Sequence, residues 1–240
     1  MPHLYAGASG FAYAAWKPEF YPQKVSQARF LEHYATRLNS VEINYTFRRS
    51  ASESTLAKWR DQTPEGFRFS VKAHQRITHF ARLKAEAAEP TEFFLRSIEP
   101  LRAAGRLGAV LFQLPPNMKL DLERLRAFLK LLPEGLRATF EFRHESWFDE
   151  ATYAALRGHN AALCQAESDE LTVPDVVTAD FVYLRLRKTA YGEDDRIAIR
   201  GKVEGLLAAG QDVFLYFKHE DTPEGALYAE ELLRGVSSHG

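Results

Sequence analysis

The stretch TFEFRHESWF, residues 139–148, combines the pattern of a buried strand with side chains that a buried strand rarely carries. Phe140 and Phe142 are aromatic and favour strands. Glu141 and Arg143 alternate with them. Because neighbouring side chains of a strand point to opposite faces, the two phenylalanines share one face and the carboxylate and guanidinium share the other. The stretch therefore predicts a strand that packs on helices by one face and is polar on the face directed into a barrel.

Seven further strand-like runs recur along the 240-residue chain. They are LYAGAS (4–9), SVEINYTF (40–47), FRFSVKA (67–73), AVLFQL (109–114), AALCQA (161–166), FVYLRLR (181–187) and VFLYFK (213–218). Amphipathic stretches such as 26–38 and 121–132 separate most of them, with Asp121 as an expected helix N-cap. The helical segment 150–158 is short, and 167–180 is weakly helical at best.

This alternation, with no linker rich in Gly, Pro or Ser, predicts an α/β protein of one domain spanning 1–240. We expect a (β/α)₈ TIM-type barrel with some helices short or missing, and a doubly wound open sheet is the alternative fold. The formal net charge of −1 argues against a generic polyanion binder but leaves local patches open. Cys164 is the one cysteine, so no intramolecular disulfide forms, and we expect it to be a small buried apolar residue. With no signal peptide or membrane span evident, the expected location is cytoplasmic, without a membrane partner.

The alternation of faces also places polar side chains inward in other strands, near the carboxyl ends where barrel active sites form. These side chains are Glu42, Asn44, Lys72, Gln113, Tyr183, Arg185, Arg187, Tyr216 and Lys218. Inward cations outnumber inward carboxylates, which predicts a positive barrel mouth complementary to a phosphate, a carboxylate or a nucleic-acid backbone. The alternative is structural, since Glu141 and Arg143 can form an internal ion pair that fixes the barrel.

Several loops after the strands carry further candidates. The segment 10–24 holds five aromatic residues that form either a stacking platform over the mouth or a self-packed cluster. Ser9 is a turn hydroxyl or a ligand contact. A divalent metal stays open as a cofactor, although no segment has a strong metal signature and nearby cations would repel the ion. The residues considered for such a site are His74, His79, His144, His219, Glu220 and Asp221, with Glu42, Glu141 and Glu167.

Six ordered blocks of the chain resemble the YecE-like family, catalogued as domain of unknown function 72. The blocks are GASGFAYAAWKPEFYP, NSVEINYTF, FRFSVKAHQRITH, LGAVLFQLPPNM, TFEFRHESWF and VFLYFKHEDTPEGAL. The resemblance implies a TIM-type barrel and no established reaction. The matching polar positions are Ser9, Glu42, Asn44, Lys72, Gln113, Glu141, Arg143, His144 and Trp147. The chain departs from the family at 185–188, where relatives often carry an Arg-x-His-Gly-like run, and at 218–219, where many carry Asn-Asn.

We therefore expect an enzyme, a hydrolase, lyase or isomerase, that acts on an anionic phosphorylated or nucleotide-like small molecule. Catalytic candidates are Glu42, Glu141 and His144, which would move protons. Substrate-binding candidates are Ser9, Asn44, Lys72, His74, Gln113, Arg143, Trp147, Arg185, Tyr216 and Lys218. One alternative is a nucleic-acid-binding or processing barrel similar to the endonuclease IV type, and the other is a non-catalytic ligand-binding barrel.

Overall fold

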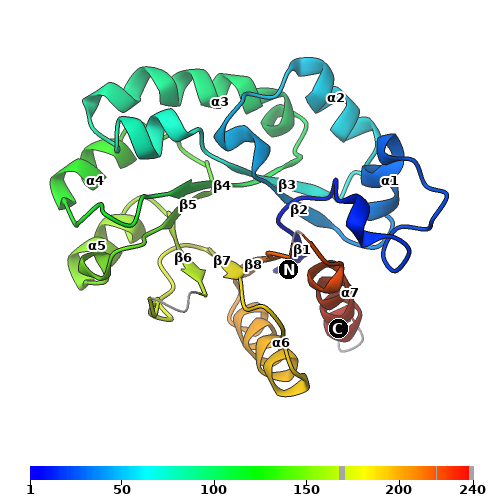
Figure 1. The fold of residues 1–240 in the computed structure, drawn as a ribbon. Coiled ribbons are helices and arrows are strands. Elements are labelled where there is room, and N and C mark those ends of the chain that lie inside the picture. Colours follow the sequence, from blue (N-terminus) through cyan, green and yellow to red (C-terminus); the bar gives the residue numbers. More distant parts are fainter. Residues whose placement is uncertain (168–170, 220, 238–240) are drawn as a thin grey trace.

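Eight parallel strands form one sheet in the computed structural model, which describes residues 1–167, 171–219 and 221–237 (Figure 1). The strands are β1 (Leu4–Ala8), β2 (Ser40–Ile43), β3 (Arg68–Lys72), β4 (Leu107–Gln113), β5 (Ala138–Glu141), β6 (Ala162–Ala166), β7 (Phe181–Leu186) and β8 (Asp212–Phe217). Their order, β1-β8-β7-β6-β5-β4-β3-β2, follows the chain around a ring. All eight predicted strand runs are therefore present, and the barrel prediction is confirmed over the open sheet.

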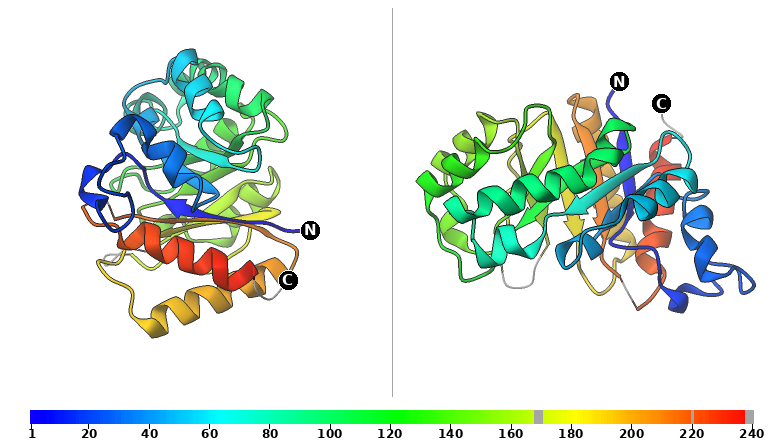
Figure 2. Two further views of the ribbon diagram at one scale, coloured as in Figure 1. Left: turned by 90° about the vertical axis from the view of Figure 1, so that its right-hand side faces the viewer. Right: turned by 90° about the horizontal axis from the view of Figure 1, so that it is seen from above.

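Helices surround the sheet on its outer side (Figures 1 and 2). They are α1 (Phe30–Tyr34), α2 (Glu53–Asp61), α3 (Ala88–Ala103), α4 (Leu122–Leu129), α5 (Glu150–Arg157), α6 (Glu193–Ala208) and α7 (Glu224–Ser237). The Asp121 side chain caps α4 by accepting a hydrogen bond from the Arg124 backbone N–H, as predicted. The described residues 171–180 between β6 and β7 contain no helix, and none of the described helices is long and apolar enough to cross a membrane.

The alternation of side chains separates an outer core from an inner one. Phe140 and Phe142 are buried in the outer core, between the sheet and the helices. Glu141 points to the other side, and Cys164 and Tyr183 lie with it inside the barrel, where Cys164 is buried as expected. The inner core is built largely from alanine, leucine and aromatic rings, so the lumen is a packed interior rather than a pore.

The barrel closes at the seam between β1 and β2, where the backbones approach closely. Ser9 bridges to Glu42 in parallel register, and the Gly10 backbone N–H donates to the Glu42 carbonyl at 2.9 Å. A Cβ atom at Gly7 would lie 1.9 Å from the Ser40 carbonyl oxygen, so this position requires glycine. The Asn39 side chain completes the seam by hydrogen-bonding to the backbone of β1. The closed seam holds the carboxyl ends of β1 and β2 in one rim.

The aromatic residues of segment 10–24 pack against each other and against α1. Trp16, Phe20 and Tyr21 are at most 1% exposed. Tyr21 stacks on Phe30 of α1 with ring centroids 4.1 Å apart. Of the two readings of this segment, the contacts support the self-packed cluster, because these three rings have no face left for a ligand.

Candidate functional site

A buried ion-pair network centred on Arg185 lies inside the barrel, near the carboxyl ends of the strands. Arg185, at the end of β7, donates through Nη2 to Glu42 at 2.7 Å and through Nη1 to Glu141 at 2.5 Å. All three side chains are at most 2% exposed. The Ser9 hydroxyl and the Tyr183 hydroxyl each donate to Glu42 at 2.7 Å. Side-chain alternation predicted that both carboxylates point into the barrel. The structure shows that a single guanidinium lies between them and binds both.

Both carboxylates are held in the ionised form. Burial alone would raise the pKa of Glu42, but Arg185 and the two hydroxyl donors outweigh burial and lower it. Burial would also raise the pKa of Glu141, whereas Arg185, Arg187 and a hydrogen bond from Gln113 lower it to about 2. A carboxylate that is ionised at neutral pH and already accepts several hydrogen bonds is a poor proton acceptor. The geometry thus fits a positioning role for Glu42 and Glu141 better than the proton transfer expected from sequence.

A second set of side chains surrounds Glu141 on the side that faces the barrel mouth. Gln113 Nε2 donates to Glu141 at 2.8 Å, and Lys72 Nζ donates to Gln113 Oε1 at 2.7 Å. Arg187 Nη2 lies 3.2 Å from Glu141, and Arg143 Nε lies 3.7 Å from it. The carboxylate is therefore shared among guanidiniums that approach it from different strands. The alternation of side chains along the strands predicted that these side chains face inward. It did not predict that they converge on one carboxylate.

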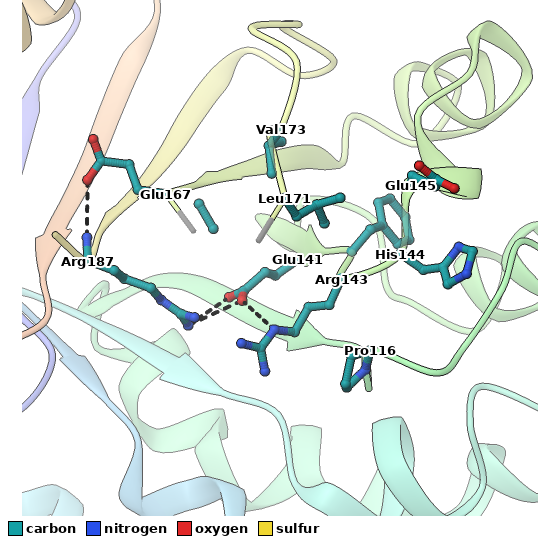
Figure 3. Close-up of a pocket in the computed structure, with 11 residues that line it drawn as sticks. Pro116, Glu141, Arg143, His144, Glu145, Glu167, Leu171, Val173 and Arg187 are labelled. Carbon is teal, nitrogen blue, oxygen red and sulfur yellow. Dashed lines mark hydrogen bonds and ion pairs between the residues drawn. The ribbon is translucent and has the colours of Figure 1, made fainter. Parts of the chain in front are cut away.

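Glu141, Arg143 and Arg187 form the floor of a pocket with a cavity volume of about 510 Å³, whereas Gln113 and Lys72 are not among its lining residues (Figure 3). In this view Arg187 and Arg143 point toward Glu141 from opposite sides. The Arg143 side chain is 40% exposed and is open to a ligand, whereas the Arg187 side chain is 17% exposed and its Nε is buried. The other lining residues are Pro116, Phe142, His144, Glu145, Ala166, Glu167, Leu171 and Val173.

Two further titratable side chains shape this pocket. His144 Nδ1 accepts a hydrogen bond from the Ser146 backbone N–H at 3.2 Å, so the neutral ring carries its proton on Nε2. Glu167, which follows β6, accepts from the Arg187 backbone N–H at 3.2 Å and from the Tyr191 hydroxyl. The Glu167 carboxylate therefore contacts the loop after β7 and also lines the pocket. Sequence offered only its position just after a strand as a signal for Glu167.

Two of the expected substrate contacts lie elsewhere in the fold. Trp147 is fully buried behind β5, where it stacks on Phe142 at 4.5 Å and its indole N–H donates to the Met118 carbonyl. Tyr216 lies deep in the lumen, and its hydroxyl bonds to Ser40 and Ser70. Neither side chain lines the pocket, because each is enclosed by packing and its polar atom is already paired. Their geometry fits structural roles rather than the expected contacts with substrate.

The remaining sequence candidates lie around the rim. His74 Nε2 is 3.2 Å from the Arg48 carbonyl, which holds the imidazole between the β2 and β3 loops. Lys218 is exposed at the end of β8 and does not line the pocket. Asn44 follows β2, and its Oδ1 is a buried acceptor that has no hydrogen-bond partner among the described residues. None of these three side chains lines the pocket described above.

The described residues contain no group of three or more His, Cys, Asp or Glu side chains that could hold a metal ion. Glu42 and Glu141, which the metal hypothesis invoked, already bind Arg185. Glu220, another residue of that hypothesis, lies outside the described residues. Two of the carboxylates that the metal hypothesis needs are therefore already engaged by a guanidinium.

Comparison with known proteins defines the class to which this barrel and its polar rim belong. The family described as "Protein of unknown function DUF72" matches residues 5–239, so the chain belongs to the DUF72 family. A DUF72 family protein from Thermotoga maritima has a crystal structure that superposes with a TM-score of 0.86 at 26% identity, covering 98% of this chain and 99% of that one. One from Enterococcus faecalis superposes at 0.77 with 21% identity, which shows the shared fold.

Two curated relatives support the same assignment. The UPF0759 protein YunF of Bacillus subtilis is 29% identical over 156 residues, which are 62% of this chain and 54% of the relative. The UPF0759 protein YecE of Escherichia coli is 36% identical over 119 residues, which are 49% of this chain and 43% of the relative. The matches thus span about half the length of these relatives. The predicted resemblance to the YecE-like family is confirmed, and neither name states a reaction.

Proposed function

We propose that the barrel mouth binds an anionic small molecule, phosphorylated or nucleotide-like, and acts on it as an enzyme. The observation that supports the proposal is the charge at the pocket floor. Arg185 and Arg187 offset the buried carboxylates Glu42 and Glu141, and Arg143 and Lys72 add two further cations close to them. The carboxylates of Glu145 and Glu167 also line the pocket. An anion is the natural complement, because guanidiniums bind carboxylate and phosphate oxygens in a planar, often bidentate geometry.

The cations of the site are buried and close to one another. Burial and then the neighbouring Arg185 lower the pKa of Arg187. Burial and Arg185 likewise lower that of Lys72. A bound anion would offset the mutual repulsion of Arg185 and Arg187. In this arrangement Glu141 positions the guanidiniums, while His144 at the pocket wall is the group placed to move a proton.

The first test is binding of inorganic phosphate and of a panel of phosphorylated metabolites by calorimetry. Arg143→Gln should weaken binding about tenfold or more, because a hydrogen bond to a charged group contributes about 1.5–3 kcal/mol. The matched control is Arg96→Gln on α3, which removes an exposed guanidinium paired only with the neighbouring Glu92. Equal affinity in wild type and Arg143→Gln would contradict the proposal.

Turnover is tested separately with the same panel. A product formed by the wild-type protein, and lost in His144→Asn with binding retained, would support the enzymatic role. Binding without turnover of any compound would favour the non-catalytic ligand-binding barrel instead.

A second candidate function, nucleic-acid binding, is favoured by one surface next to the pocket. The loops 44–50 and 72–84 hold six lysines and arginines and no aspartate or glutamate. The loops contact each other, since the Thr46 hydroxyl donates to the Lys72 carbonyl at 2.7 Å. Tyr45 is 48% exposed and Phe80 is 70% exposed there. Exposed rings among cations suit base stacking beside a phosphate backbone.

Binding of a single-stranded oligonucleotide, followed by anisotropy over a range of salt concentrations, tests this candidate. We expect affinity to fall steeply with salt, with a log–log slope of about −0.7 per phosphate contact, and Phe80→Ala to weaken binding. A flat salt response or no binding at low salt would rule the candidate out.

A further inference from the structure

We propose that Lys72 is a reactive amine that forms an imine with an anionic aldehyde or ketone held at the barrel mouth. The inference rests on the proposed anion-binding function and narrows its substrate class to carbonyl compounds. It assigns to Lys72 covalent chemistry in place of the simple electrostatic contact expected from the sequence.

The position of Lys72 suits this role. It is the last residue of β3, and its side chain is partly exposed on the face that points into the barrel mouth. Its Nζ lies 4.2 Å from the centroid of the Phe47 ring, which supports one side of the amine. The backbone of Lys72 is also held in place, because its carbonyl accepts a hydrogen bond from the Thr46 hydroxyl at 2.7 Å. The amine is thus positioned at the rim, with Phe47 on one side of it.

The hydrogen bonds around Lys72 fix its orientation without consuming its lone pair. Ionised Glu141 can only accept, so the amide nitrogen of Gln113 faces Glu141 and the amide oxygen faces Lys72. Gln113 therefore accepts an N–H from the amine, and the neutral amine keeps its lone pair for attack. Glu141 in turn is held by Arg185, so the chain of contacts anchors the amine to the buried ion-pair network.

Burial and a neighbouring positive charge increase the fraction of Lys72 amines that are neutral. Burial and then Arg185 lower its pKa to about 8, against the opposing effect of Glu141 and Glu42. At roughly pH 7.5 an amine with this pKa is about one quarter neutral, whereas an ordinary lysine is about 0.1% neutral. Only the neutral amine is nucleophilic, so the environment raises the reactive fraction by about two orders of magnitude.

The reaction balances with groups present in the protein and substrate. The Nζ lone pair attacks the carbonyl carbon, and the carbonyl oxygen takes one of the two amine protons to give a carbinolamine. The carbon–oxygen bond then breaks, the hydroxyl leaves with a proton from nitrogen as water, and a carbon–nitrogen double bond forms. Arg143 and Arg187 would hold the phosphate or carboxylate of the same molecule. The class is therefore a small aldehyde or ketone that carries an anionic group.

The test uses pyridoxal 5′-phosphate as probe, with borohydride reduction and peptide mass spectrometry of the intact chain. We expect Lys72 to be labelled at least tenfold faster than the exposed Lys130, with a pH midpoint near that of an amine of lowered pKa. Pyridoxal, which lacks the phosphate, should lose this preference, and inorganic phosphate should compete with the phosphorylated probe. Lys72→Arg should abolish selective labelling, whereas Lys130→Arg should leave labelling of Lys72 unchanged.

The outcomes separate this inference from the proposed anion site. Phosphate binding in wild type together with equal labelling of Lys72 and Lys130 would overturn the imine proposal and leave the anion site standing. Loss of both phosphate binding and selective labelling would overturn both. Selective labelling with a pH midpoint like that of an ordinary lysine would also contradict the account, because reactivity would then not come from the environment described.

Discussion

Replacing Glu42 with glutamine tests the buried network most sharply, because it removes one charge and almost no volume. Glu42 is fully buried and pairs with Arg185 at 2.7 Å. Breaking a buried ion pair by removing one partner costs about 3–5 kcal/mol. Arg185 keeps Glu141 as a partner at 2.5 Å, so we expect the lower end of that range, about 3 kcal/mol. With a urea m-value of about 3 kcal/mol/M for a chain of this size, the unfolding midpoint should fall by roughly 1 M.

The assay is urea unfolding followed by tryptophan fluorescence and circular dichroism, at neutral pH. The matched control is Glu231→Gln on α7, where the carboxylate pairs with Arg196 at 3.1 Å but is 59% exposed, so the change should cost less than about 1 kcal/mol. The double mutant Glu42→Gln, Arg185→Gln should lose less stability than the sum of the two single changes. It contains neither charge of the Arg185–Glu42 pair, so neither charge is left buried without the other. A cost for Glu42→Gln no larger than that of the control would refute this reasoning.

Three further predictions concern the same barrel. The free energy of unfolding should fall as the pH drops from about 4.5 toward about 2, because the pKa of Glu141 is lower in the folded than in the unfolded protein. The stabilisation by Glu141 is therefore complete only above the unfolded pKa, and pH-dependent thermal unfolding measures its loss. Gly7→Ala should destabilise by about 3 kcal/mol or more, or prevent folding, since the added Cβ would meet the Ser40 carbonyl at 1.9 Å, and urea unfolding checks this. Trp147→Phe should cost about 1–3 kcal/mol through the unpaired Met118 carbonyl and a small void, while phosphate affinity measured by calorimetry stays unchanged.

The sequence predicted which faces of the strands are polar because side-chain alternation is a local property of the backbone. Phe140 and Phe142 had to pack outward, so Glu141 had to point inward, and the structure has this arrangement. The eight-strand count followed from equally local signals. The barrel and the inward cations at its mouth were therefore accessible from the chain alone.

The pairing within the site was not accessible in this way. Arg185 and Glu42 lie 143 residues apart, and nothing local indicates that one guanidinium joins two carboxylates. The consequence, that both carboxylates are ionised and poorly suited to proton transfer, depends on this long-range contact. The packing of Trp147 was inaccessible for a related reason, since a loop position next to the rim gives no sign that the ring turns back to stack on Phe142.

We propose that the mouth of this barrel holds an anion between the guanidiniums of Arg143 and Arg187, which follow β5 and β7. The most direct measurement is a crystal soaked in selenate, with anomalous scattering used to locate the ion. The account predicts an anomalous peak within hydrogen-bond distance of Arg143 and Arg187 in the pocket above Glu141, and its loss in Arg143→Gln crystals. A soaked crystal with an open, solvent-filled pocket and ions bound only at other surfaces would contradict it.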